Sequence, residues 1–95
     1  MIFMSRKDYL FFNCLGQRYK EKGEEFELSR NFECACQNFS VAGECYGKAE
    51  EIAREDMMIE HGVTRMKKEY CLSKASIMSE KSRQLLSSAS RHSNK

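Results

Sequence analysis

Apolar side chains recur at helical spacing along most of the chain, beginning near the N-terminus. Phe12, Leu15 and Tyr19 stand at i, i+3 and i+7, which places them on one face of a helix. Gly23 can end that helix by adopting a positive φ angle. The pattern therefore predicts a helix over residues 6–22.

Two more apolar stripes follow before the middle of the chain. The second predicted helix covers residues 25–38, and its buried face is expected to hold Leu28, Phe32, Ala35, Cys36 and Phe39. The third covers residues 40–60, with Ser40 at its start and His61-Gly62 as its stop signal. Its expected inner face comprises Ala42, Cys45, Tyr46, Ala49, Ile52, Ala53 and Met57. Its outer, solvated face is expected to carry Glu44, Glu50, Glu51, Glu55 and Asp56.

A fourth and longer helix is predicted over residues 63–90. One face repeats for almost five turns through Cys71, Ala75, Met78, Ser82, Leu85 and Ala89. No other predicted helix is long enough to cover it, so residues 79–90 are expected to project, to fray or to dock on another molecule. The last residues, 91–95, are polar and are expected to form a disordered tail.

The predicted fold class is all-α. About four helices, arranged as antiparallel hairpins, would form a small bundle with a long C-terminal helix. Residues 1–90 are expected to form a single helical domain, as suits a chain of 95 residues. The chain has no proline, which agrees with a helical fold.

The first hairpin carries a motif that resembles one tetratricopeptide unit. The matching string is F-x-x-L-G-x-x-Y-x-x-x-G followed by L-x-x-x-F-x-x-A, within residues 12–39. In this string Gly16 lies beside the apolar stripe, where the lack of a side chain lets a second helix approach closely. The resemblance implies a protein-binding helical hairpin without chemistry of its own.

A second stretch is similar to small bacterial AraC-negative-regulator proteins. It consists of Ala42, Cys45, Tyr46, Ala49, Ile52, Ala53 and Arg54, with Tyr70-Cys71 further along. The tryptophans typical of that group are missing, because the chain has no Trp. The resemblance implies a protein that binds and antagonises a transcription activator.

Charge is divided unevenly along the chain. Residues 1–62 hold eight Lys/Arg and twelve Asp/Glu, a net −4, whereas residues 63–95 hold eight Lys/Arg and two Asp/Glu, a net +6. A basic last helix can meet an acidic protein, a nucleic acid or an acidic helix of the same fold. The residues proposed to contact a partner are Phe3, Phe11, Met57, Met58, Arg65, Lys67, Lys68, Lys74, Lys81 and Arg83.

The five cysteines do not form a recognisable metal motif. No C-x-x-C pair exists, and Cys34 and Cys36 would point to opposite sides of a helix. Cys71 has basic neighbours that can lower a thiol pKa, but a core-facing position is the simpler interpretation. No metal, cofactor or catalytic residue is predicted, and the chain is not expected to be an enzyme.

The sequence favours a small interaction protein that inhibits or adapts a larger protein, of bacterial or phage origin. The alternatives are a nucleic-acid-binding regulator that uses the basic C-terminal helix and a cysteine-rich, zinc-stabilised domain. No apolar run is long enough for a membrane span, and the N-terminus lacks the features of a secretory signal, so a cytoplasmic location is expected. A homodimer would also cover exposed apolar residues.

Overall fold

The computed structural model describes the backbone of residues 6–93 and the side chains of residues 6–88. Within this range the chain forms three α-helices: α1 (Arg6–Leu28), α2 (Phe32–Glu55) and α3 (His61–Ser93). The predicted all-α class is confirmed. The predicted number of about four helices is wrong, because residues 25–28 of the second predicted helix belong to α1 and its later residues are continuous with the third in α2.

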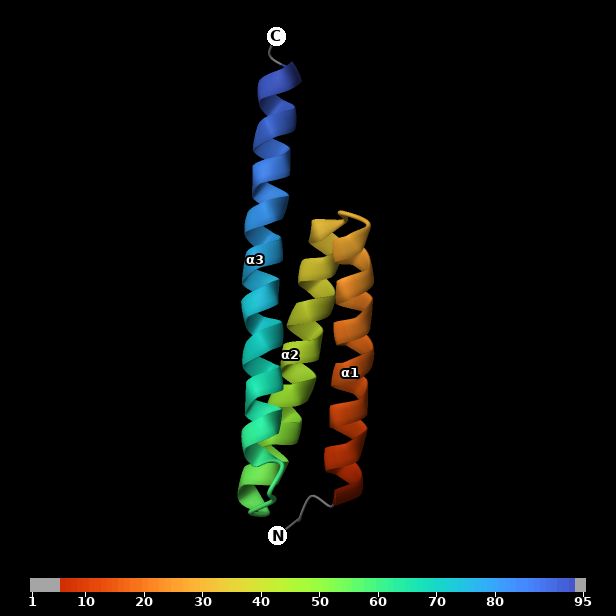
Figure 1. The fold of residues 1–95 in the computed structure, drawn as a ribbon, viewed down its shortest axis with the longest axis vertical. Coiled ribbons are helices and arrows are strands. Elements are labelled where there is room, and N and C mark those ends of the chain that lie inside the picture. The colour runs from red at the N-terminus through yellow and green to blue at the C-terminus, as the bar shows by residue number, and fades with distance from the viewer. Residues whose placement is uncertain (1–5, 94–95) are drawn as a thin grey trace.

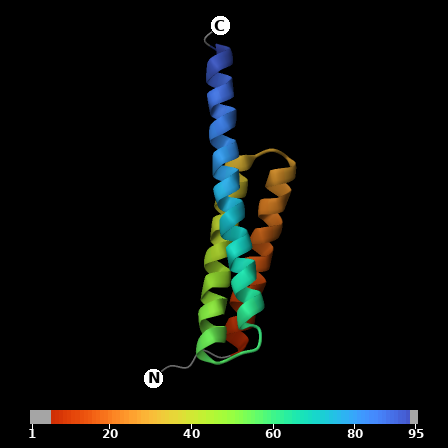
Figure 2. The same ribbon diagram turned by 60° about the vertical axis from the view of Figure 1, so that its left-hand side comes forward.

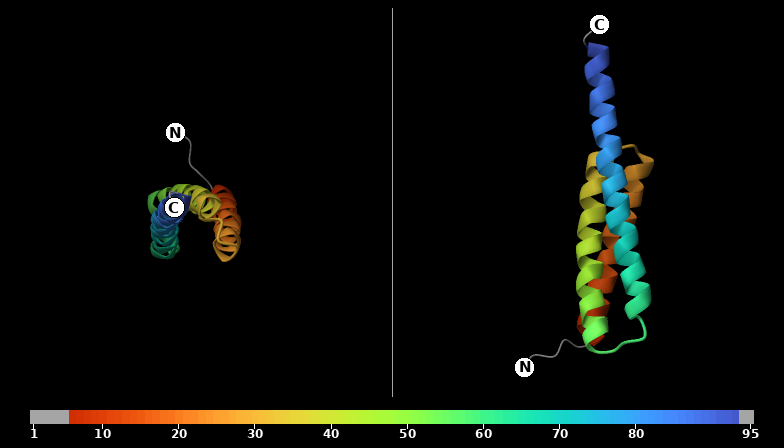
Figure 3. Two further views of the ribbon diagram at one scale, coloured as in Figure 1. Left: turned by 90° about the horizontal axis from the view of Figure 1, so that it is seen from above. Right: turned by 90° about the vertical axis from the view of Figure 1, so that its left-hand side faces the viewer.

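The three helices run antiparallel in sequence order and form an elongated molecule of 62 × 22 × 16 Å. Figure 1 shows α2 between α1 and α3, and in the turned view of Figure 2 α3 passes in front of the other two helices. Both α1 and α3 pack along α2 but meet one another only marginally. Seen from above, the helices form an open arc with α2 at its base (Figure 3). The core therefore consists of two interfaces that share α2.

The α1–α2 interface repeats every seven residues on both helices. Gly16 faces the ring of Tyr46, and Gly23 faces the ring of Phe39, with 3.0 Å between each ring and the place of a Cβ. One layer further down, the aromatic partner is on α1, because Tyr9 packs in one cluster with Ala53. Each layer thus joins one aromatic residue to one small residue. The expected close approach at Gly16 is confirmed.

Gly23 does not end the first helix. It is buried inside α1, which continues to Leu28. The helix ends instead in a Schellman motif: Asn31 N–H donates to Phe26 O at 2.9 Å and Arg30 N–H donates to Glu27 O at 3.0 Å. Arg30 takes the left-handed conformation at φ 62°. Asn31 then caps α2 by accepting a hydrogen bond from Cys34 N–H.

The turn between α2 and α3 begins with the same Schellman motif. Met58 N–H donates to Ala53 O at 2.7 Å, Met57 N–H donates to Arg54 O at 3.3 Å, and Met57 has φ 53°. Met58 also packs on the core cluster that contains Ala53, which is the apolar contact that accompanies such a motif. His61 and Gly62, expected to stop a helix, are the first residues of α3.

The third helix is continuous and extends beyond the α1–α2 turn, as Figure 1 shows. Its face toward α2 holds Thr64, Cys71, Ala75 and Met78, all buried. Residues 91–93, expected in a disordered tail, are its last helical residues in the structure.

Candidate functional site

The open side of the arc contains an apolar depression between α1 and α3. It has a volume of 530 Å³ and is lined by Lys20 of α1 and by Val63, Met66, Lys67 and Tyr70 of α3. We call it the trough. It exists because α2 holds the two outer helices apart, so that the α3 residues next to the core face have no helix to cover them.

The apolar lining of the trough is well exposed. Val63, Met66 and Tyr70 stand at i, i+3 and i+7 on α3 and are 57%, 70% and 43% exposed. This spacing puts all three on one side of the helix. An exposed apolar row of this kind is a feature of binding surfaces more than of solvated ones.

Hydrogen bonds and ion pairs from α1 to α3, or to the turn that precedes α3, bound the trough along the molecule. Toward the α2–α3 turn, Arg6 pairs with Glu60 at 2.7 Å. Near the same end the Tyr9 hydroxyl donates to Thr64 Oγ1 at 2.8 Å, because the Thr64 hydroxyl hydrogen is already donated to Glu60 O. In the other direction, Lys74 pairs with Glu27 at 2.7 Å. These contacts hold α1 and α3, the two sides of the trough, next to each other.

Two lysines of the trough lie over aromatic rings. Lys20 Nζ is 5.6 Å from the centroid of Tyr70, and Lys67 Nζ is 5.8 Å from that of Tyr46. In the described part of the chain, neither amine pairs with a carboxylate. Burial raises the pKa of Tyr46 to about 12 and also raises the pKa of Tyr70. Both phenols are therefore neutral at physiological pH, and the Tyr70 hydroxyl donates a hydrogen bond to Glu24 Oε2 of α1 at 3.4 Å.

The basic residues predicted as partner contacts are divided between inside and outside. Lys68 donates to Glu50 at 2.8 Å, Lys74 pairs with Glu27, and Lys81 lies 5.4 Å from the ring centroid of Phe32. The arginines point outward and pair within their own helix, Arg65 with Glu69 at 3.2 Å and Arg83 with Glu80. Of the predicted basic residues, the structure places Lys67 alone in the trough.

The predicted apolar contacts do not lie together. Phe11 is exposed on the outer side of α1, where its ring meets Phe12 edge to face at 5.2 Å. The side chain of Met57 is exposed to solvent in the α2–α3 turn, whereas that of Met58 packs against the core. Phe3 lies outside the described residues.

Glu50 is a correction to the expected solvated face of the third predicted helix. It is 4% exposed, and beside Lys68 its carboxylate has Arg54 at 3.9 Å and His61 at 3.8 Å. The hydrogen bond from Lys68 lowers the pKa of Glu50, against the opposing effect of burial. The cluster ties α2 to α3 by placing one buried carboxylate against the side chains of Lys68, Arg54 and His61.

The cysteines are free thiols in the described part of the chain. Burial raises the pKa of Cys71 to about 11, so its basic surroundings do not make it a thiolate. Among the residues whose side chains are described, no group of three His, Cys, Asp or Glu residues is placed to hold a metal ion.

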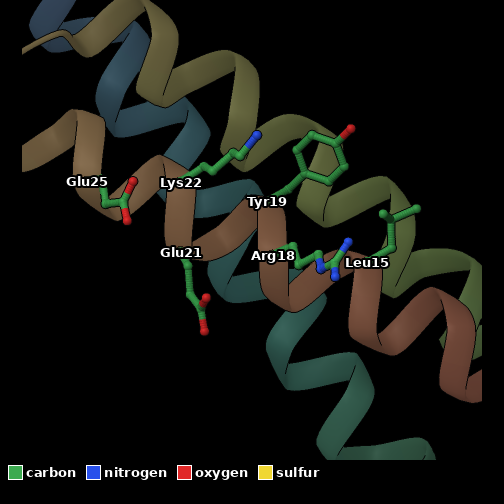
Figure 4. Close-up of a pocket in the computed structure, with 6 residues that line it drawn as sticks. All are labelled: Leu15, Arg18, Tyr19, Glu21, Lys22 and Glu25. Atoms are coloured by element: carbon green, nitrogen blue, oxygen red, sulfur yellow. The ribbon is translucent and has the colours of Figure 1, made fainter.

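A second depression lies on α1 alone, and Figure 4 shows its six lining side chains spreading from the helix. It has a volume of 420 Å³ and is lined by Leu15, Arg18, Tyr19, Glu21, Lys22 and Glu25. Its acidic and basic residues alternate, which leaves little net charge. This surface offers no stronger site than the trough.

Comparison with protein families, with curated proteins and with solved structures gives no match. In residues 6–93 no helix has both the length and the apolar character needed to cross a bilayer. The trough is therefore the main structural guide to function. Its apolar row was missed in the sequence, although the spacing of Val63, Met66 and Tyr70 was readable. The apolar face predicted for that helix was the deeper stripe through Cys71 and Met78.

Proposed function

We propose that this chain is a small, non-catalytic protein-interaction module that binds a segment of a larger protein in the trough and modulates that protein. The observation that carries the proposal is the exposed row of Val63, Met66 and Tyr70 beside two lysines that pair with no carboxylate among the described residues. A docked apolar segment would remove this row from water, at roughly 25 cal/mol per Å² of apolar surface.

The two sequence resemblances support a regulatory role in this proposal. A tetratricopeptide-like hairpin implies protein binding, and the likeness to AraC-negative-regulator proteins implies a protein that antagonises a transcription activator. We propose a bacterial or phage regulator that acts in the cytoplasm. The apolar row provides affinity, while Lys20 and Lys67 orient a partner that carries acidic residues.

The test is affinity capture from host lysate by the tagged chain and by two variants. Met66→Glu places a charge in the trough, and Ile59→Glu is the matched control because Ile59 is 94% exposed in the turn outside the trough. We expect one stoichiometric protein that survives nuclease and high salt, is lost with Met66→Glu and is kept with Ile59→Glu.

Two results would overturn this proposal. Equal capture by both variants would remove the trough from the interaction. Recovery of nucleic acid alone, decreasing as salt rises, would replace protein binding by nucleic-acid binding through the outward arginines of α3.

A further inference from the structure

The core face of α3 continues beyond the helix that covers it. Met78 of this face is fully buried in one cluster with Phe32, which is the first residue of α2. One turn further along α3 Ser82 is half-buried, and Leu85, next on the same stripe, is 43% exposed. Figure 1 shows α3 running past the α1–α2 turn at this level. Leu85 therefore occupies a core position for which the described chain provides no partner helix.

A recess of 360 Å³ lies where α3 passes the turn. It is lined by Arg30, Phe32, Lys81, Gln84, Leu85 and Ser88. Phe32 lies between two cations, with Arg30 at 5.8 Å and Lys81 at 5.4 Å from its ring centroid. In the described part of the chain, neither cation pairs with a carboxylate. The recess thus combines an apolar base with two cationic walls.

The charge of the surrounding segment has one sign. Residues 81–93 include Lys81, Arg83 and Arg91 and no Asp or Glu. Arg83 pairs with Glu80 and is not among the residues that line the recess. A partner complementary to this end must be acidic as well as apolar.

We propose that the recess binds an acidic amphipathic helix of another protein. The helix would continue the line of α2, with an apolar side chain on Leu85 and carboxylates beside Arg30 and Lys81. This inference rests on the proposed function in one respect, that the partner is a protein. It does not need the trough, because Tyr70 and Lys81 lie roughly 16 Å apart along α3 at ~1.5 Å per residue.

The chemistry of the recess favours a protein over other anionic partners. The one aromatic ring at its base, Phe32, is buried and unavailable for base stacking. Leu85 lies in a hollow beside the turn, which a protruding side chain can enter and a flat lipid surface cannot.

The test is a selection of displayed random peptides of about 16 residues, roughly four helical turns, against the full chain. Binding of the selected peptides is then measured by fluorescence anisotropy. We expect sequences with acidic and apolar residues at helical spacing. Lys81→Glu and Arg30→Glu should each weaken their binding by about tenfold or more, the effect of losing one important interface contact.

The matched control is Arg83→Glu, which makes the same charge change in the same segment but outside the recess. It should change the affinity by less than about twofold, about 0.4 kcal/mol. Met66→Glu should leave these peptides bound, which separates the recess from the trough. Circular dichroism of each variant shows whether the helices are intact.

Several results would overturn the inference. One is the selection of peptides without acidic residues. Another is an equal loss of peptide affinity with Arg83→Glu and with Lys81→Glu. A third is a loss of peptide affinity with Met66→Glu alone. A concentration-dependent dimer that Leu85→Glu dissolves would assign the face to a second copy, and preferential binding of duplex DNA or anionic vesicles would assign it to those partners. If the peptides fail while Met66→Glu still abolishes capture from lysate, the recess inference fails and the proposed function stands.

Discussion

Gly16 and Gly23 lie against aromatic rings so closely that a methyl group has no free space. An alanine Cβ at Gly16 would stand 3.0 Å from three atoms of the Tyr46 ring. Because Tyr46 is fully buried and cannot move outward, we expect Gly16→Ala to lower the free energy of unfolding by about 1–3 kcal/mol. Urea unfolding followed by circular dichroism measures this change.

Gly47 provides the control for this prediction. It also lies inside a helix, but an added Cβ would meet only Lys68 Cδ at 3.5 Å, an ordinary contact. Gly47→Ala should therefore stabilise the chain by roughly 0.5–1 kcal/mol, since alanine favours helix more than glycine does. Equal effects of the two variants would show that the close ring contact has no energetic weight.

Glu50 makes stability depend on pH in the acidic range. Its pKa is lowered from the ordinary value of 4.5 by the hydrogen bond from Lys68, so the unfolded chain binds the proton more readily. The stabilisation is present above pH 4.5 and is lost as pH falls through the lower, folded-state pKa. We expect Glu50→Gln to be less stable than wild type at neutral pH and the difference to shrink as pH falls below 4.5.

Urea unfolding of both proteins between about pH 3 and pH 7 checks this expectation. Glu51→Gln removes one carboxylate from the exposed neighbouring position and is the control for net charge. Stability curves of wild type and Glu50→Gln that stay parallel down to the lowest pH would contradict the assigned role of Glu50.

At the scale of the elements, the two turns show where sequence patterns stop being informative. Both helices end at a left-handed residue that is not glycine, Arg30 and Met57. Glycine is the usual residue there, so Gly23 and His61-Gly62 were the natural choices from sequence. Gly23 instead fits against Phe39, and packing along α2 outweighs the local preference of glycine for a helix end.

Met57 provides a prediction at this scale. The left-handed conformation costs a residue with a Cβ roughly 1–2 kcal/mol, and the Met57 side chain is 91% exposed, so it offers little packing in return. Met57→Gly should therefore raise the thermal midpoint, with a gain in stability of up to about 1 kcal/mol. Asp56→Gly, at a neighbouring position with φ −90°, should lower it. A lower midpoint for Met57→Gly would show that the Met57 side chain contributes contacts of its own.

Periodicity was sufficient for the helical class and the long last helix, but it placed the turn of the first hairpin too early, at Gly23 instead of after Leu28. It could not show which basic residues are exposed, because Lys68 pairs with Glu50 of α2 and Lys74 pairs with Glu27 of α1. Both partners come from other helices and meet these lysines only in the folded chain. The same applies to Glu50, which stands among acidic residues in the sequence but faces Lys68 in the fold. The trough could not be predicted from the sequence either, since Lys20 and Tyr70 come from different helices and meet only in the fold.

At the scale of the whole molecule, α2 is the only helix of residues 6–93 that packs against a neighbour on both sides. Its backbone hydrogen bonds are shielded by α1 and α3, whereas residues 86–93 of α3 pass beyond both neighbours (Figure 1). We expect hydrogen exchange to be slowest in the centre of α2, intermediate in α1 and fastest in residues 86–93. Equal protection of residues 86–93 and the centre of α2 would mean that the overhang is covered in solution, as by a second copy.

The marginal contact between α1 and α3 also bears on how the chain acquires its structure. Each large interface joins helices that are neighbours in the sequence, α1 with α2 and α2 with α3. The first hairpin can therefore form before α3 has left the ribosome, and α3 then adds to a finished surface. Such local topologies fold in roughly microseconds to milliseconds. The arrangement that leaves one side of the molecule open thus also removes the slow search for contacts between its two ends.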